Sequence, residues 1–158
     1  WRTDRSRVPL YLSSPQAADV LLNLLPPGPC RVLDLGCGDA SLLRRLARKR
    51  PESQFVGLEH APLTWLWARV ASGGLPNLSV RREDFWRHGL TGYDLVYAFL
   101  SPVPMARLRD KASAEMNSGA VLVSNSFPLP DLAEDMRIAV GDRAMSYFYV
   151  YRLRGGAV

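Results

Sequence analysis

The sequence has few of the features that mark several protein classes. Its two cysteines, Cys30 and Cys37, are too few and too poorly spaced for a zinc site or a disulfide scaffold, so we expect structural thiols, no metal and a reducing, cytoplasmic location. No apolar run approaches the roughly 20 residues that span a bilayer, and the polar, basic N-terminus predicts no signal peptide. Because the chain starts at Trp1 rather than at methionine, what precedes it stays open.

The sequence also has only a small excess of positive over negative charge. The net charge of +5 is spread mostly over arginines, which is too diffuse to favour nucleic acid as a partner, although it leaves that partner open. With 158 residues, of which 47% are hydrophobic and 22% charged, the chain has the size and composition of one globular domain. We predict a single domain over 1–158 with residues 1–14 as an N-terminal arm, and the sequence leaves the oligomeric state open.

Short apolar runs alternate with helical patterns along most of the chain. Strands are expected at 31–35, 55–59, 78–82, 93–99 and 119–125. Helices are expected at 15–25, 40–50, 62–72 and 105–116, the first with Ser14 as its N-cap. The alternation lapses over 127–135, and 136–140 and 146–153 are expected to form a final antiparallel pair, with both faces of the last strand covered. The fold class is therefore α/β, a doubly wound, seven-stranded and mostly parallel sheet with a C-terminal antiparallel hairpin.

The first expected strand leads into a Gly-x-Gly turn that carries two acids. Asp34 comes near the end of the strand, Gly36 and Gly38 form the turn, and Asp39 follows it. Glycines let the backbone approach a ligand closely, but the third glycine of a nicotinamide or flavin site and the Walker lysine are both missing. Two carboxylates would repel a polyphosphate by roughly 4 kcal/mol per pair of unit charges at ~4 Å, and they suit a ligand with an ammonium and a sulfonium. The turn therefore favours S-adenosylmethionine over nucleotides, with an ordinary strand-to-helix turn as the alternative interpretation.

Acids also stand at the ends of the next two expected strands. Glu59 lies 23 residues after Gly36, close to the roughly 20 expected of an acid that binds ribose hydroxyls. Asp84 is placed to accept a hydrogen bond from an adenine amino group, with the backbone of Phe85 near a ring nitrogen. Any one of these acids is more often a loop cap, but three at matched strand ends predict an adenosine site.

At this point the chain resembles the class I methyltransferases that use S-adenosylmethionine. The first motif of that family is matched by 32–39, although Ala40 stands where a third glycine is common. The second- and third-strand acids are matched by Glu59 and Asp84, and the closing hairpin by 136–153. The resemblance covers nearly the whole chain and implies S-adenosylmethionine as the cofactor.

A closer resemblance is to the small protein-lysine methyltransferases, the archaeal broad-specificity enzymes and the mitochondrial ones that act on translocase or ATP-synthase subunits. It is carried by the segments 8–15, 83–86, 97–105 and 123–128. The resemblance implies that the arm helps to close the cofactor pocket and that Phe99, Ser101 and Pro102 position the acceptor. His60 follows Glu59 where the group often has asparagine, so the ribose contacts are open. The expected cofactor-binding residues are Tyr11, Ser14, Asp34, Leu35, Gly36, Cys37, Gly38, Glu59, His60, Asp84, Phe85 and Phe99.

The expected reaction is an in-line displacement at the methyl carbon, for which the protein mainly supplies alignment. A dry, aromatic mouth would lower the pKa of a lysine amine, and its candidate wall consists of Tyr11, Trp65, Trp86 and Phe99. His60 and His88 are the only histidines and neither is required as a base. With no inserted lid and no Asn/Asp-Pro-Pro-aromatic motif, a protein substrate is favoured. A small-molecule or RNA methyltransferase and a non-catalytic S-adenosylmethionine-binding module remain as alternatives.

Overall fold

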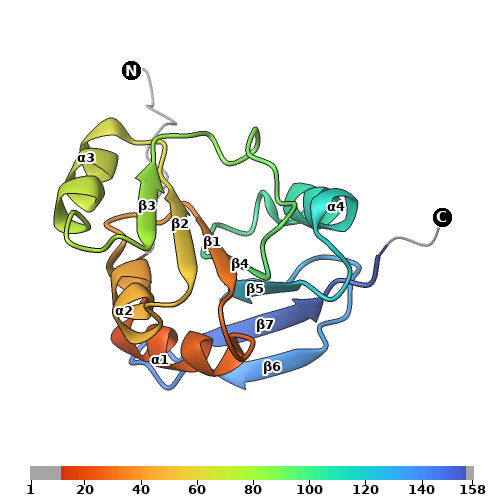
Figure 1. The fold of residues 1–158 in the computed structure, drawn as a ribbon. Coiled ribbons are helices and arrows are strands. Elements are labelled where there is room, and N and C mark those ends of the chain that lie inside the picture. The colour runs from red at the N-terminus through yellow and green to blue at the C-terminus, as the bar shows by residue number, and fades with distance from the viewer. Residues whose placement is uncertain (1–11, 156–158) are drawn as a thin grey trace, which may run out of the picture.

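A seven-stranded sheet forms the centre of the molecule, as expected from the sequence (Figure 1). The structure is a computed structural model and describes residues 12–155. The sheet has the order β3-β2-β1-β4-β5-β7-β6, in which the first five strands of the chain run parallel and β7 pairs antiparallel with both β5 and β6. The strands are β1 Arg31–Leu35, β2 Gln54–Leu58, β3 Leu78–Arg81, β4 Leu95–Ala98, β5 Val121–Asn125, β6 Met136–Ala139 and β7 Tyr147–Arg152.

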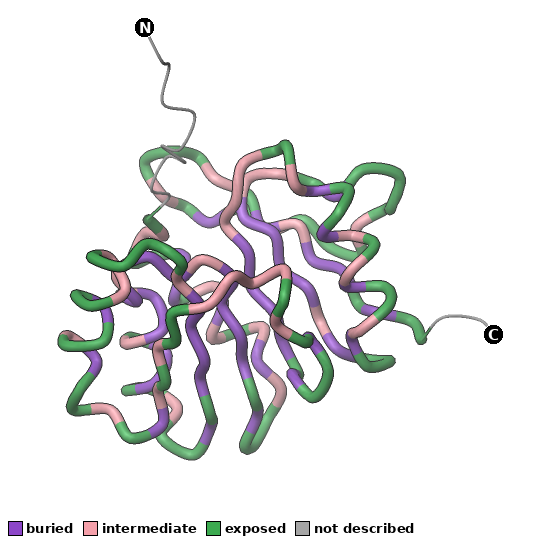
Figure 2. Tube along the Cα trace, turned by 90° about the horizontal axis from the view of Figure 1, so that it is seen from above, coloured by how far each residue is buried: buried purple, intermediate pink, exposed green. Residues whose placement is uncertain are grey.

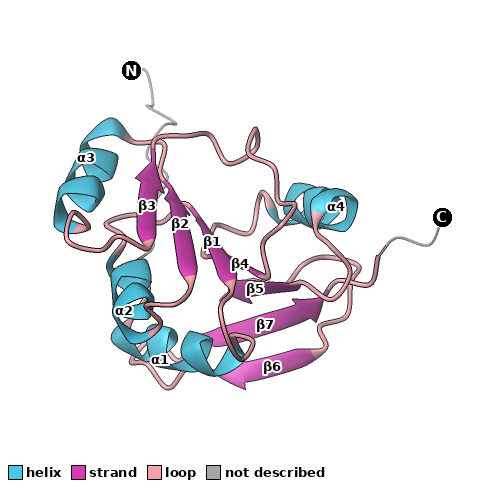
Figure 3. Cartoon of the chain, viewed as in Figure 1, coloured by secondary structure: helices cyan, strands magenta, loops and turns pink. Residues whose placement is uncertain are grey.

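Helices cover both faces of this sheet (Figure 3). They are α1 Pro15–Leu24, α2 Ser41–Lys49, α3 Pro62–Ala71 and α4 Met105–Glu115. Buried residues of α1, α2 and α3 pack with one set of strand side chains, and buried residues of α4 pack with the alternate set. Adjacent strand residues such as Val32 and Leu33 therefore enter opposite cores, because successive side chains of a strand point to opposite faces. Figure 2 shows the buried positions gathered along the strands and the exposed ones on outer helix turns and loops.

The local signals of the sequence account for most element boundaries. Ser14 is the N-cap of α1, where its hydroxyl accepts a hydrogen bond from the Ala17 amide at 3.2 Å, and Pro15 takes the first helical position. Strands β1 and β4 are buried on both faces, as continuous apolar runs in a parallel sheet should be. Between β5 and β6 the described chain forms no helix, which confirms the predicted lapse of the βα alternation.

Apolar side chains that the sequence pattern assigns to the core are exposed to solvent in two places, on α3 and at the start of β7. The side chains at the helical spacing on α3 are exposed, with Leu63 at 82%, Trp67 at 64% and Val70 at 70%. The helix packs on the edge strand β3 through the buried Ala68 and through the half-buried Trp65, whose Nε1 donates to the Val80 carbonyl oxygen at 3.3 Å, because an edge strand offers little area to cover. The expectation that both faces of the last strand are covered is wrong at its start, where Tyr147 is 45% exposed. Phe148 on the other face is fully buried.

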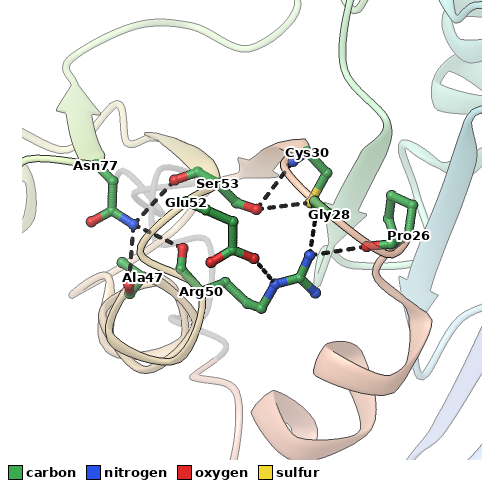
Figure 4. A network of polar contacts seen from close by, with 8 residues as sticks. All are labelled: Pro26, Gly28, Cys30, Ala47, Arg50, Glu52, Ser53 and Asn77. Carbon is green, nitrogen blue, oxygen red and sulfur yellow. Dashed lines mark hydrogen bonds and ion pairs between the residues drawn. The ribbon is translucent and has the colours of Figure 1, made fainter.

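The amino ends of β1 and β2 are held by a compact polar network (Figure 4). The side-chain amide of Asn77 donates hydrogen bonds to the carbonyl oxygens of Ala47, Arg50 and Ser53 at 3.0, 3.2 and 3.1 Å. The Ser53 hydroxyl accepts from the Cys30 amide at 3.1 Å. This network lies at the edge opposite to the acids, so it stabilises the sheet and leaves the carboxyl edge for function. Cys30 and Cys37 are both buried and free, as expected of structural thiols.

Candidate cofactor site

The three predicted strand-end acids lie on adjacent strands of the sheet. Asp34 is in β1, Glu59 directly follows β2, and Asp84 comes three residues after the end of β3. Since β3, β2 and β1 are parallel neighbours in the sheet, the three acids share its carboxyl edge. The sequence therefore predicted their grouping correctly.

The Gly-x-Gly turn between β1 and α2 adopts left-handed backbone conformations at three alternate positions. Gly36 has φ +73°, Gly38 has φ +58° and Ala40 has φ +59°. Only glycine takes such angles without strain, so Ala40 carries a conformational cost where a glycine would not. The turn thereby presents its backbone, free of Cβ atoms at Gly36 and Gly38, toward the carboxyl edge.

Close packing of this turn on β2 depends on Gly57, which the sequence analysis did not single out. The Cys37 amide donates to the Leu58 carbonyl oxygen at 2.8 Å, which draws the turn onto the strand. A Cβ on Gly57 would lie 2.7 Å from the Cys37 sulfur and 2.8 Å from a methyl carbon of Leu43. The signal that could have identified Gly57 is a glycine inside an apolar strand, which marks a close backbone approach.

Asp34 is the most perturbed acid of the group. Its side chain is 3% exposed, and burial together with the nearby Glu59 carboxylate raises the pKa of Asp34 to about 8. Burial disfavours the charged form of a carboxyl group, and a second negative charge adds to that effect. Near neutral pH Asp34 is therefore mostly protonated in the structure as it stands, and a cation brought beside it would favour its ionisation.

The remaining acids are anchored by their own loops. Glu59 accepts hydrogen bonds from the amides of Gly38 at 3.0 Å and Ala61 at 2.9 Å, so it links the glycine turn to the end of β2. Asp39 accepts from the Ser41 amide at 2.9 Å, and Asp84 accepts from the Trp86 amide at 3.0 Å. The bonds from Ala61, Ser41 and Trp86 are local loop caps, whereas the bond from Gly38 joins two loops, and together they hold each carboxylate in a defined place. A carboxylate oxygen has two acceptor positions, so these bonds leave capacity for a ligand.

A small cleft beside the turn joins several of the predicted residues. Its walls include Asp34, Gly36, Cys37, Asp39, Tyr97 and Phe99, with Leu12 and Ser13 closing one side. Its volume of about 10 Å³ holds roughly one water molecule, so a larger ligand requires the walls to open. Neither lysine nor arginine is among its walls in the described part of the chain, and both of its carboxyl groups are acids of the turn. Two carboxyl groups without a nearby basic side chain favour a bound cation and repel a phosphate.

The arm is attached to the cleft through a hydrogen bond that the sequence analysis missed. The Ser13 hydroxyl lies 2.7 Å from the Tyr97 hydroxyl, and the side-chain amide of Asn125 donates to the same Tyr97 oxygen at 2.9 Å. Burial raises the pKa of Tyr97, which keeps the phenol neutral and able to bond. Ser14 instead donates to Asp142 in the β6–β7 turn at 3.3 Å, and Tyr11 lies outside the described residues.

The other expected site residues are spread along the same edge but do not line the cleft. The Leu35 side chain is fully buried in the core on the α4 side, so only its backbone faces the turn. His60 is exposed, and the ring of Phe85 lies 4.5 Å from that of Trp86. Ser101 is half-buried, and Pro102 is exposed where the chain turns into α4. Of the three predicted acceptor residues, only Phe99 is a wall of the cleft.

Neither histidine stands among the walls of the cleft. Both ring nitrogens of His88 are engaged, Nδ1 with the Glu83 carboxylate at 2.7 Å and Nε2 with the Tyr93 hydroxyl at 2.9 Å. Across residues 12–155 there is no group of three or more His, Cys, Asp or Glu side chains that could hold a metal ion. Nor is any helix in that range long and apolar enough to cross a membrane.

Comparison with known families and proteins gives a consistent result. The family model of the ANTKMT methyltransferase domain matches residues 34–136. The adenine nucleotide translocase lysine N-methyltransferase of Mus musculus is 31% identical over 147 residues, which cover 90% of this chain and 64% of the mouse protein. An uncharacterised methyltransferase of Mycobacterium tuberculosis is 38% identical over 72 residues, 37% of this chain and 36% of that protein. The chain thus spans less than two thirds of the length of these relatives.

Solved structures agree on the fold. An RNA methyltransferase from Salinibacter ruber, solved with S-adenosyl-L-homocysteine, superposes with a TM-score of 0.81 at 22% identity and covers 94% of this chain and 97% of its own. The TrmN structure from Thermus thermophilus has a TM-score of 0.70 at 19% identity, with 87% and 48% covered. At such identities the likeness concerns the sheet and its helices rather than the acceptor.

Proposed function

Since this chain belongs to the ANTKMT methyltransferase domain family, we propose that it transfers methyl groups from S-adenosylmethionine to lysine side chains of a protein substrate. The observation that carries the proposal is the acidic carboxyl edge around the glycine turn. Asp34 and Asp39 stand at a cleft whose walls, as far as residues 12–155 form them, include neither lysine nor arginine, and Glu59 and Asp84 follow the next two strands. Such a site accommodates a cationic adenosine compound and disfavours a phosphate-bearing one.

The residues present can be assigned to parts of the cofactor. Asp34 and Asp39 would face its positive groups, and the bare backbone at Gly36 and Gly38 allows close approach. Glu59 would accept the ribose hydroxyls and Asp84 the adenine amino group, in addition to the loop amides that already fix both carboxylates. The cofactor supplies a methyl group that is already a strong electrophile.

The chain then contributes alignment and exclusion of water. The lone pair of a neutral lysine amine forms the new N–C bond as the C–S bond breaks, the electron pair stays on sulfur, and the surplus proton leaves to solvent. Correct alignment can contribute about 7–11 kcal/mol to such a step. A general base is not required, because an apolar approach favours the neutral amine. His60 is exposed and His88 is bonded elsewhere, which supports this mechanism.

The decisive experiment incubates the protein with methyl-labelled S-adenosylmethionine and a cell lysate. We expect protease-sensitive label that appears as methyllysine after acid hydrolysis and mass spectrometry. Nuclease-sensitive label would identify an RNA methyltransferase, label in small metabolites a small-molecule enzyme, and binding without turnover a non-catalytic module.

The buried free thiols Cys30 and Cys37 support our proposal of a reducing compartment such as the cytoplasm.

Calorimetry tests the cofactor assignments separately. Glu59→Ala and Asp84→Ala should each weaken S-adenosylmethionine binding by about tenfold or more, the equivalent of one charge-assisted hydrogen bond. Asp19→Ala, which removes an exposed acid of α1, is the matched control and should bind like the wild type. Unchanged affinity in both site variants would contradict the assignments.

A further inference from the structure

A second hollow shares Phe99 with the cofactor cleft. We call it the aromatic groove; its walls include Phe99, Ser126, Phe127, Met145, Ser146 and Tyr147, and its volume is about 260 Å³. Within residues 12–155, Phe99 is the one wall residue that the groove and the cleft share. The two hollows therefore meet at this ring.

The order of the strands explains this arrangement. The acids of the cofactor site lie in or after β1, after β2 and after β3, which form one half of the sheet. The walls of the aromatic groove come after β4, after β5 and at the start of β7, which are the next strands across the sheet. A ligand in the groove would thus lie over the half of the carboxyl edge that the acids leave unused.

The groove is uncharged and unusually exposed for its composition. Its walls in the described part of the chain carry three aromatic rings, a thioether and three hydroxyl groups, one of them the phenol of Tyr147, and they include no Asp, Glu, Lys or Arg. Met145 is 78% exposed and Tyr147 is 45% exposed, although large apolar side chains gain stability from burial. Such a surface binds an aliphatic chain along its rings, and it favours a neutral amine over an ammonium.

Two of the four non-glycine residues with positive φ in the described chain are walls of the groove. Ser126 has φ +70° and Met145 has φ +54°, left-handed conformations that non-glycine residues seldom adopt. A residue held in such a conformation costs about 1–3 kcal/mol, and strain of this kind gathers at ligand sites. Both residues are walls of the groove, so the strain shapes it directly.

We infer that the aromatic groove receives the acceptor lysine, with its aliphatic stem on the rings of Phe127 and Tyr147 and its amine directed past Phe99 to the cofactor cleft. This inference rests on the proposed function and deepens it. Phe127, Met145 and Tyr147 become residues that determine acceptor binding, while the acids of β1 to β3 determine cofactor binding.

The test measures transfer of labelled methyl groups from S-adenosylmethionine to lysate protein, with cofactor affinity followed by calorimetry. Tyr147→Ala and Phe127→Leu should raise the KM for the protein acceptor about three- to tenfold, which is the loss expected when part of the apolar contact with the aliphatic stem is removed. Both variants should bind the cofactor like the wild type, which also shows that they fold. Tyr147→Phe keeps the ring and should restore the wild-type KM.

Controls come from the same strand pair. Tyr149→Ala removes a ring two residues further along β7, and Met136→Ala removes an exposed apolar side chain of β6, which lies outside the groove. Neither control should change the KM. Arg143→Ala alters a neighbouring hollow that has Arg143 as a wall and shares Phe99, Ala144 and Ser146 with the groove.

The outcomes separate this inference from the proposed function. A wild-type protein that labels no lysine refutes the proposed function. Lysine labelling that Tyr147→Ala and Phe127→Leu leave unchanged, or that only Arg143→Ala weakens, overturns the groove while the proposed function stands. A raised KM in the two groove variants alone, with restoration by Tyr147→Phe, supports the groove.

Discussion

The raised pKa of Asp34 makes a prediction about stability that is independent of any substrate. In the folded protein the carboxyl group ionises near pH 8, whereas its ordinary value is 3.8. Asp34→Asn keeps the size of the side chain and removes the ionisation. We expect this variant to be more stable than the wild type near neutral pH, and to lose cofactor affinity because an amide cannot offer a negative charge.

The direction of the stability change with pH follows from the number of protons that the folded and unfolded states bind. Between pH 3.8 and about 8 the folded state holds a proton on Asp34 that the unfolded chain has released, so the wild type loses stability as the pH rises through this window. The loss is about 1.4 kcal/mol per pH unit, which adds up to on the order of 4 kcal/mol at neutral pH. Below pH 3.8 Asp34 is protonated in both the folded and the unfolded state of the wild type. The free energies of unfolding of wild type and variant should therefore differ little there.

Denaturant unfolding at several pH values between about 4 and 8 measures the difference. The free energy of unfolding of Asp34→Asn minus that of the wild type should grow steadily with pH. Asp19→Asn, at an exposed position of α1, serves as the control and should track the wild type. A difference that stays constant across the range would mean that Asp34 is ionised in the folded protein. The conclusion that its carboxyl group is protonated near neutral pH would then be wrong.

Three further substitutions test the architecture of the site. Gly57→Ala should cost about 1–3 kcal/mol in unfolding free energy by overpacking, and less in a Cys37→Ala background, because its Cβ would meet the Cys37 sulfur at 2.7 Å; a double-mutant cycle measures the coupling. Tyr97→Phe removes the hydroxyl that bonds Ser13 and Asn125, so it should cost about 1–3 kcal/mol and weaken cofactor binding in calorimetry. Ser14→Ala removes the cap of α1 and should lower the free energy of unfolding by about 1 kcal/mol, which denaturant unfolding measures.

Local signals in the sequence predicted the sheet and the acidic edge well. The acids and the glycine turn are short-range patterns, in which a strand end and the chemistry that follows it lie within a few residues. Parallel strands then bring Asp34, Glu59 and Asp84 to one edge by topology alone. For the same reason the cap of α1 at Ser14 could be predicted before any tertiary contact was known.

Contacts between distant segments could not be predicted in the same way. The bond between Ser13 and Tyr97 joins residues 84 positions apart, and neither residue type marks such a pair. Solvent exposure on α3 also escaped prediction, because helical periodicity cannot tell that the helix covers only an edge strand. The exposure of Tyr147 has a similar cause, since no helix of the described chain follows β5 to cover that part of the sheet.

One chain of hydrogen bonds connects the cofactor cleft to the aromatic groove. Ser13 bonds the Tyr97 hydroxyl at 2.7 Å, Asn125 donates to Tyr97 at 2.9 Å, and Ser126 donates to Asn125 at 2.8 Å. Tyr97 and Asn125 are each only 1% exposed, so removing the Tyr97 hydroxyl would leave the buried amide of Asn125 without this partner at a cost of about 1–3 kcal/mol. Because Ser13 is a wall of the cleft and Ser126 a wall of the groove, the chain keeps both walls at a set distance across the ends of β4 and β5. A methyl donor and an amine on opposite sides of Phe99 would then meet at a separation that the fold maintains, which is the alignment that this reaction requires.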